Sequence, residues 1–192
     1  EYTGLDGEQT YKTGAGQRRA YEKGFRYTEF LPMASASLDV TDNLTTYASW
    51  SQGYLPGGFN VFSASSKDTF YYKPEYSTNY ELGLKTHWLD NKLQANVSAF
   101  YSDIRDKQVR EEVPSAGIGT WKFTNSAKAH TSGVELEVRA YPLEGWELRG
   151  GVGYARSEID QWTVSTPSGG RKNYSGNRLP WAPDLTYHLG VG

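Results

Sequence analysis

The sequence of 192 residues contains no cysteine, which excludes disulfides and cysteine-based metal or redox sites. It also has no run of about 18 apolar residues, so no transmembrane helix is expected. The formal net charge is only −2, and this excludes a general attraction to nucleic acid. The chain starts at Glu1 without an apolar signal segment, so we expect any secretory signal to have been removed or to lie outside this sequence.

The common motifs of catalysis and nucleotide binding are missing as well. The chain has no GxSxG, no P-loop and no GxGxxG. Its three histidines, His87, His130 and His188, lie far apart and form no HExxH pattern. We therefore expect no enzyme, no catalytic residue and no metal site built by the protein.

What the sequence does contain is a repeated alternation of apolar and polar residues. Within residues 76–88, for example, Leu82 and Leu84 fall on one face, while Gly83 and Lys85 fall on the other. A period of two is typical of β-strands, whereas a helix would need a period of 3.6. The alternation predicts seven strands, at 34–40, 44–53, 76–88, 93–103, 134–140, 146–154 and 185–191.

The connections between these strands alternate in length. Short connections rich in turn residues are expected at 41–43, 89–91 and 142–145, and long ones at 54–75, 105–131 and 159–180. In an antiparallel sheet, this order places every short turn at one edge and every long loop at the other. Outer-membrane barrels have this arrangement, with short periplasmic turns and long extracellular loops.

A soluble β-sandwich with one wet face would also produce alternating strands. Two features weigh against it. The strand at 76–88 is about twice as long as the ~5–6 residues usual in globular proteins. In addition, Tyr76, Tyr80 and Trp88 bracket its apolar row as interfacial aromatics do in membrane barrels. We therefore interpret the chain as all-β, a segment of an antiparallel transmembrane β-barrel, with a soluble β-sandwich binding module (for carbohydrate, for example) and a passive outer-membrane barrel as alternatives.

Six blocks of sequence, in order, resemble the barrel of TonB-dependent outer-membrane receptors. Within that family the chain is most similar to ferric siderophore receptors of the ferric yersiniabactin (pesticin) receptor type, over residues 33–192. The blocks are YASWSQGYLPGGFN (47–60), YKPEYSTNYELGLK (72–85), FYSDIRD (100–106), NSAKA (125–129), GVELE (133–137) and GNRLPWAP (176–183).

The resemblance implies a barrel of about 22 strands, to which this chain would contribute about seven. Residues 1–32 would form an extracellular loop and residues 33–192 the strands and loops of a partial barrel domain, with the plug domain absent from the chain. The implied function is uptake of a ferric siderophore, or a similar scarce chelate, across the bacterial outer membrane, energised through TonB. Expected partners are outer-membrane lipid, the chelate, TonB through the missing plug, and the rest of the barrel. Iron would enter only within its chelate, so no cofactor is expected.

Two groups of residues are candidates for binding the ligand and for lining the lumen of such a receptor. Loop aromatics and cations suit an anionic, ring-bearing ferric chelate, although ordinary loop packing explains them too. The ligand candidates are Tyr54, Phe59, Asn60, Arg110 and Trp121. The side chains of the polar face would either line the lumen or simply keep a polar wall hydrated. They are Glu81, Lys85, His87, Glu135, Glu137, Arg139, Glu147 and Arg149. Asp103 and Arg156 end two apolar rows, and we interpret them as rim positions beyond the hydrocarbon.

Overall fold

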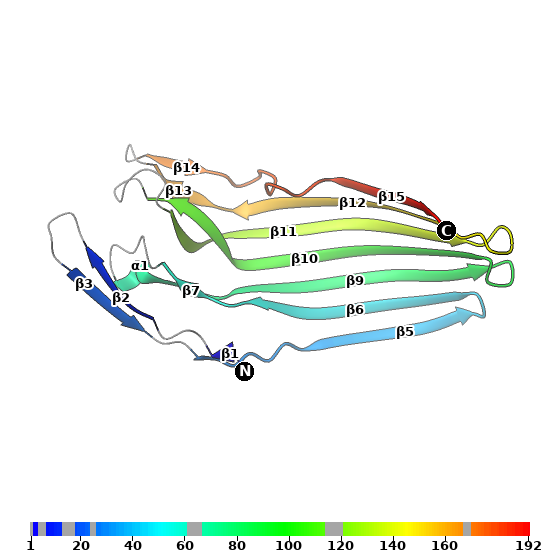
Figure 1. Ribbon diagram of the computed structural model, residues 1–192, viewed down its shortest axis with the longest axis horizontal. Helices are drawn as coiled ribbons and strands as arrows, with labels where there is room; N and C mark the ends of the chain where they lie inside the picture. The colour runs from blue at the N-terminus through cyan, green and yellow to red at the C-terminus, as the bar shows by residue number, and fades with distance from the viewer. Residues whose placement is uncertain are drawn as a thin grey trace.

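The chain forms one large antiparallel sheet of seven strands with smaller strand pairs at one end (Figure 1). The computed structural model describes all residues except 1, 4–6, 13–17, 24–25, 61–66, 114–120 and 167–169. The strand order β15-β12-β11-β10-β9-β6-β5 makes each strand of the sheet pair with the one before and after it along the chain. These strands are β5 (Met33–Thr41), β6 (Leu44–Leu55), β9 (Glu75–Trp88), β10 (Leu93–Glu112), β11 (Trp121–Ala140), β12 (Leu148–Gln161) and β15 (Leu185–Val191).

The remaining elements are short. They pair as β1 (Tyr2–Thr3) with β4 (Arg26–Tyr27), β2 (Gly7–Lys12) with β3 (Arg18–Lys23), β7 (Gly58–Phe59) with β8 (Tyr71–Tyr72), and β13 (Thr163–Ser165) with β14 (Arg171–Asn173). One helical turn, α1 (Lys67–Phe70), precedes β8. Among the described residues, no helix has the length and hydropathy needed to cross a membrane. Figure 1 shows the short turns of the sheet at its right end and the short strand pairs β2–β3 and β13–β14 at its left end.

The pairing register joins the apolar rows of separate strands into one face. Directly opposed residues of an antiparallel pair point to the same side of the sheet. The apolar face is therefore continuous across all seven strands, as the sequence predicted. One of its rows runs through Leu38, Thr46, Leu84, Val97, Leu136, Val152 and Tyr187.

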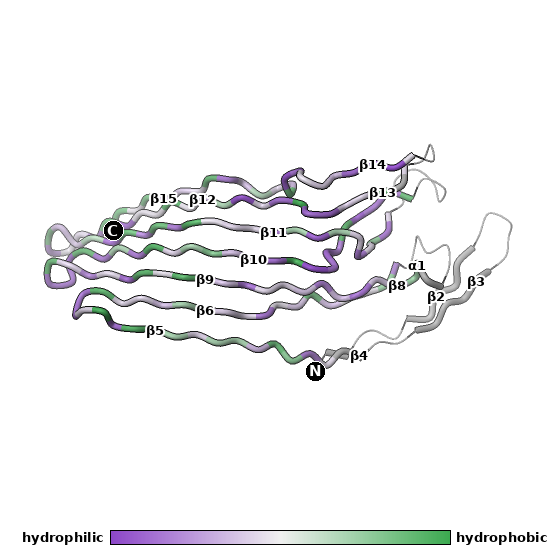
Figure 2. The backbone as a smooth tube through the Cα atoms, turned by 180° about the vertical axis from the view of Figure 1, so that it is seen from behind, coloured by the Kyte–Doolittle hydropathy of each residue, from purple (hydrophilic) through white to green (hydrophobic). Residues whose placement is uncertain are grey.

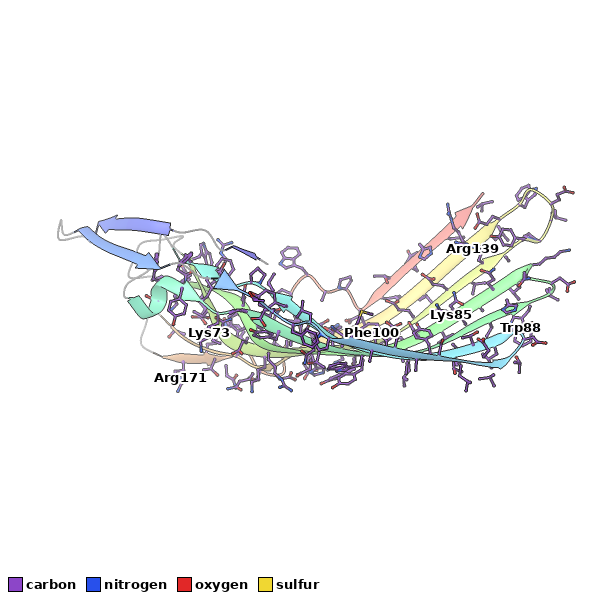
Figure 3. All side chains as sticks on the ribbon, turned by 90° about the horizontal axis from the view of Figure 1, so that it is seen from below. Lys73, Lys85, Trp88, Phe100, Arg139 and Arg171 are labelled. Carbon is purple, nitrogen blue, oxygen red and sulfur yellow. The ribbon has the colours of Figure 1, made fainter. Side chains whose placement is uncertain are left out.

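This apolar face is exposed rather than packed. Leu82 is 64% exposed, Tyr187 81% and Leu189 83%. A soluble sheet would bury such a face against a second layer, but Figure 3 shows the large sheet as a single curved layer with side chains on both sides. Among the described residues, the buried apolar side chains are Phe70, Ala127, Ala129 and Ile159, all toward the long-loop end. The described residues therefore form no sandwich core, and the apolar face needs another apolar environment.

The dimensions of the face suit a bilayer. From Trp88 to Tyr80, β9 rises over eight residues, or about 27 Å at ~3.4 Å per residue. A tilt of about 40° reduces this to a height of about 21 Å, close to the apolar band of about 25 Å in outer-membrane barrels. Figure 2 shows hydrophilic colours at the turns and around the far ends of β10 and β14, outside this band.

The predicted loop at 105–131 is wrong in extent. β10 and β11 each have 20 residues, and only the segment between Glu112 and Trp121 connects them. The register shifts between Ile104 and Lys107 and again before Val109. These bulges break the period of two while strand pairing continues, so the alternation ends where the strands do not. At ~3.4 Å per residue each strand is about 68 Å long, and roughly half of it extends beyond a bilayer.

A charge placed on the exposed face tests this assignment. In the full-length protein that contains this segment, Leu84→Arg should prevent or strongly weaken insertion into lipid vesicles. The reason is that a cation at the bilayer midplane of a barrel costs about 2–4 kcal/mol. Lys85→Leu changes the neighbouring residue on the other face and should have a far smaller effect. Co-flotation with vesicles measures both, and equal losses for the two variants would contradict the assignment of faces.

Candidate functional site

The polar residues predicted to face a lumen lie together on the side of the sheet opposite the apolar face. Lys85 pairs with Asn96, which in turn pairs with Glu137 on β11. Arg139 pairs with Arg149 on β12, one row nearer the short turns. Figure 3 labels Lys85 and Arg139 in this part of the sheet. The predicted residues of β9, β11 and β12 therefore form one polar surface rather than separate patches.

Several of these charges are bonded to neighbours within the wall. The Tyr47 hydroxyl donates a hydrogen bond of 2.5 Å to Glu81 Oε1. The Lys85 ammonium lies 5.1 Å from the centre of the Tyr47 ring, a cation–π contact. Arg139 Nε lies 3.1 Å from Glu147 Oε1. Paired charges of both signs make a surface that can hydrogen-bond water or another polar surface, but none of these contacts activates a nucleophile.

Glycines on the polar face make room for large side chains from adjacent strands. A Cβ built on Gly83 would collide with the Tyr47 ring, and one on Gly133 would come within 2.6 Å of Phe100 Cζ. Each glycine is the register partner of that aromatic residue. Tyr47 is not among the predicted lumen residues, because its contacts with Glu81 and Lys85 depend on a glycine 36 residues away, which no local pattern reveals.

At the long-loop end, Asn60 holds the loop at 54–75 against β11. Its side chain is buried, with 5% of its surface exposed. Asn60 Oδ1 accepts from the Phe123 amide at 2.7 Å, and its Nδ2 donates to the carbonyls of Phe123 and Thr69 at 2.9 and 3.0 Å. The role of Asn60 as a ligand contact stays a prediction, since the structure gives its amide a set of backbone partners instead.

Asn125 and Gln108 hold the same region together where the bulges interrupt strand pairing. Asn125 Oδ1 accepts from the Lys73 amide at 2.6 Å, and its Nδ2 donates to the carbonyls of Lys73 and Asp106, both at 2.8 Å. Gln108 Nε2 donates to the Pro56 carbonyl at 2.9 Å. The bulge leaves Asp106 out of the strand pairing, and Asn125 supplies a partner for its carbonyl. The bonds to Lys73 and Pro56 tie the neighbouring segments to the bulged strands.

Aromatic residues at this end of the molecule pack in pairs. The rings of Tyr54 and Tyr76 lie 5.7 Å apart, and those of Phe59 and Phe70 lie 5.1 Å apart. Tyr72 contacts the Phe123 ring at 5.2 Å, and burial raises the pKa of the Tyr72 phenol. Tyr54 and Phe59, two of the predicted ligand residues, are thus in aromatic contacts within this end of the molecule.

The other two predicted ligand residues meet in a hollow of about 700 Å³, which we call the outer hollow. The Arg110 guanidinium lies over the Trp121 ring, 4.3 Å from its centre. The outer hollow is lined by the far ends of β10 and β11 and by the β13–β14 hairpin, through Arg110, Glu111, Glu112, Val113, Trp121, Lys122, Thr124, Ser126, Trp162, Thr163, Val164, Thr166, Lys172 and Tyr174. Tyr54, Phe59 and Asn60 are not among these lining residues.

Three lining residues of the outer hollow escaped the sequence prediction. Trp162 and Tyr174 stack with ring centres 4.7 Å apart, and the Lys172 ammonium lies 4.9 Å from the Tyr174 ring. The indole Nε1 of Trp162 is buried without a hydrogen-bond partner among the described residues. These residues lie in the predicted loop at 159–180, where no periodic pattern marks them. Two aromatic–cation pairs suit a flat, anionic ligand.

Within the described part of the chain, no group of three or more histidine, aspartate or glutamate side chains could hold a metal ion. His130 Nδ1 instead lies 2.6 Å from Asp160 Oδ1, and its ring stacks on Tyr101.

Removing an amide at the bulges tests whether these contacts hold the outer end. Asn125→Ala should lower the free energy of local opening at the outer end by about 1–3 kcal/mol, because the backbone groups of Lys73 and Asp106 lose their partners. Hydrogen exchange in the full-length protein should rise around these two residues. Asn96→Ala removes the same group from the middle of the sheet and serves as the control. Unchanged exchange in Asn125→Ala would show that the contacts contribute nothing.

Comparison with known proteins gives consistent matches along the chain. The family model described as TonB dependent receptor-like, beta-barrel, matches residues 2–192. The pesticin receptor of Yersinia enterocolitica is 33% identical over 157 residues, which cover 81% of this chain and 21% of that protein. The ferripyoverdine receptor of Pseudomonas aeruginosa is 30% identical over 130 residues, covering 64% of this chain and 15% of the receptor. The chain thus spans about a fifth of the length of the pesticin receptor.

Solved structures agree with the sequence comparison. The crystal structure of the ferric yersiniabactin uptake receptor FyuA from Yersinia pestis superposes with a TM-score of 0.69 at 25% identity, covering 92% of this chain and 24% of that one. The siderophore receptor PiuA from Acinetobacter baumannii shares the fold, with a TM-score of 0.67 at 20% identity, covering 93% of this chain and 25% of that one.

Proposed function

Because the chain belongs to the TonB-dependent receptor-like β-barrel family, we propose that it forms part of the wall of a bacterial outer-membrane receptor that takes up a ferric siderophore. The observation that carries this proposal is the continuous exposed apolar face on a sheet whose other face is polar and charged. Such a sheet is stable only between lipid and a wet interior. The relatives named above, a pesticin receptor and receptors for ferric yersiniabactin and ferripyoverdine, support the class of cargo.

The orientation of the wall follows from its two ends. In outer-membrane barrels the short turns are periplasmic and the long loops extracellular. The turns after β5, β9 and β11 then face the periplasm, and the outer hollow faces the medium where a chelate arrives. Residues 1–32 would belong to the extracellular side, and residues 33–192 to the partial barrel domain.

The polar face would border the passage taken by the cargo. Lys85, Glu137 and Arg149 present charges of both signs, which favour water and the polar surface of a plug domain over a dry seal. TonB would supply energy through that plug, and no residue of this chain is assigned to the contact. Iron is cargo within its chelate, so the chain needs no cofactor and performs no catalytic step.

The outer hollow is the best-supported place for a first contact with the cargo. A cation over an aromatic ring contributes about 0.5–1 kcal/mol when exposed and ~2 kcal/mol when desolvated. The contacts favour a chelate that carries an aromatic ring and negative charge. Contacts from Tyr54, Phe59 and Asn60 remain part of the prediction made from the sequence.

A binding experiment tests this function in the full-length protein that contains the segment. Ferric yersiniabactin and ferripyoverdine serve as probes, and quenching of tryptophan fluorescence reports binding. The Arg110→Gln, Trp121→Ala double variant should raise the Kd of the bound probe by about tenfold or more, equivalent to ~1.4 kcal/mol. Arg171→Gln, on β14 but not lining the outer hollow, should leave the Kd within about twofold.

Two outcomes would contradict the proposal at different levels. Equal affinity in the double variant and in Arg171→Gln would contradict binding in the outer hollow, but it would not contradict the receptor function. Failure of the wild-type protein to bind any ferric chelate, together with normal growth of a deletion strain under iron limitation, would remove siderophore uptake itself.

A further inference from the structure

The last strand row of the polar face, next to the short turns, has a different charge from the rows outside it. It consists of His87, Gln94, Arg139, Arg149 and Gly190, which are register partners from β9 to β15. Arg139 is the next-to-last residue of β11, and Arg149 is the second residue of β12. In the orientation proposed above, this row lies at the periplasmic end of the passage. We call Arg139 and Arg149 the arginine pair.

The arginine pair places two like charges directly opposite each other on neighbouring strands. Like charges in such positions destabilise a sheet, whereas opposite charges stabilise it. Arg139 is partly compensated, because its Nε lies 3.1 Å from Glu147 Oε1. Arg149 is exposed and forms no side-chain hydrogen bond or ion pair with any residue that the structure describes. Two cations against one carboxylate leave a net positive charge, which an anion from outside this segment would neutralise.

A glycine on the next strand makes room for the Arg149 side chain. A Cβ built on Gly190 would lie 2.8 Å from Arg149 Nε and 3.1 Å from its Cγ. The Arg149 side chain therefore lies across β15 along the polar face, and a larger residue at position 190 would displace it. Because its partner on β15 has no side chain, Arg149 meets no competing charge there.

The rows on the outer side of the arginine pair carry mostly negative charge. Glu137 lies one row outward, Glu135 two rows and Glu81 three rows. Among the residues paired within these three rows, Lys85 is the one lysine or arginine. An anion that moves inward along this wall is therefore repelled first, and then attracted by the arginine pair.

We infer that the arginine pair binds the anionic part of the ferric chelate as it leaves the passage toward the periplasm. This inference rests on the proposed function, which gives the passage an anionic cargo. Charges of one sign in a confined site concentrate a mobile counter-ion and raise its rate of arrival. A guanidinium also donates paired hydrogen bonds to a carboxylate. The pair thus lowers the free energy of the cargo just beyond the rows of carboxylates that raise it.

A fixed carboxylate of the missing plug domain is the other anion that could reach the arginine pair. The order of charges along the wall favours the mobile anion. A plug that stays in place gains from a cation beside any of its carboxylates, at any depth. It does not require the cations of the wall to lie inward of the carboxylates, as they do for Arg139 and Arg149 relative to Glu81 and Glu135.

Removing one charge tests the inference in the full-length receptor in the outer membrane of TonB-competent cells. Radiolabelled ferric yersiniabactin and ferripyoverdine are the probes, with the Kd measured in de-energised cells and the maximal uptake rate in energised ones. Arg149→Gln should lower the maximal rate per folded receptor by about threefold or more, because the moving anion loses its counter-charge. The Kd should stay within about twofold of the wild-type value. Arg149→Lys keeps the charge and should keep the maximal rate within about twofold.

The control removes the same type of side chain from the other face of the same strand. Arg156 lies on β12 and shares the apolar face with Tyr101, because both are register partners of Ser132. Arg156→Gln should leave the maximal rate within about twofold. If Arg149→Gln does not fold, Arg139→Gln should show the loss in its place.

Equal maximal rates in Arg149→Gln and Arg156→Gln would overturn the inference. Increased entry of vancomycin into TonB-deficient cells that carry Arg149→Gln would overturn it as well, because the pair would then hold the plug domain closed. A wild-type protein that binds neither chelate would contradict the proposed function. Normal binding with an unchanged maximal rate in Arg149→Gln would contradict only the role of the arginine pair.

Discussion

Every backbone amide and carbonyl of a membrane strand must be hydrogen-bonded within the protein, because hydrocarbon offers no partner and each unsatisfied group costs several kcal/mol. The seven-stranded sheet meets this demand internally between neighbouring strands. Its edge strands, β5 and β15, are paired on one side only in the described sheet, and they need the rest of a barrel to meet it. The same constraint separates the two faces. Because the backbone must stay in paired strands, successive side chains point in turn to lipid and to the interior.

The central part of this wall could be predicted from the sequence because lipid and water impose a period of two on every strand. Residues 185–191 form a strand with the predicted bounds, and 76–88 differ by one residue. Beyond the bilayer both faces meet water, so the alternation fades. The predicted strands therefore miss the part of β10 that runs through its bulges to Glu112 and the part of β11 from Trp121 to residue 133. Arg110 and Trp121 were identified by residue type. Trp162, Lys172 and Tyr174 were not, because only the folded hairpin brings them to the same hollow.

The two ends of the strands carry different kinds of interaction. In the membrane, Tyr47, Glu81 and Lys85 form local pairs over Gly83 and keep the polar wall ordered without a packed core. At the outer end, the side-chain amides of Asn60 and Asn125 replace the regular ladder. This division leaves aromatic rings and cations around the outer hollow, where we propose that a ligand binds, while the sheet below supplies a rigid support.

The most direct test of this account is water accessibility along β9. The segment has no native cysteine, so single cysteines can be placed at positions 81, 82, 84, 85, 86 and 87 of the full-length protein in vesicles. A membrane-impermeant thiol reagent should label positions 81, 85 and 87, which face the wet interior, and spare positions 82, 84 and 86, which face lipid. Equal labelling at all six positions would contradict the assignment of one face to lipid and the other to the passage.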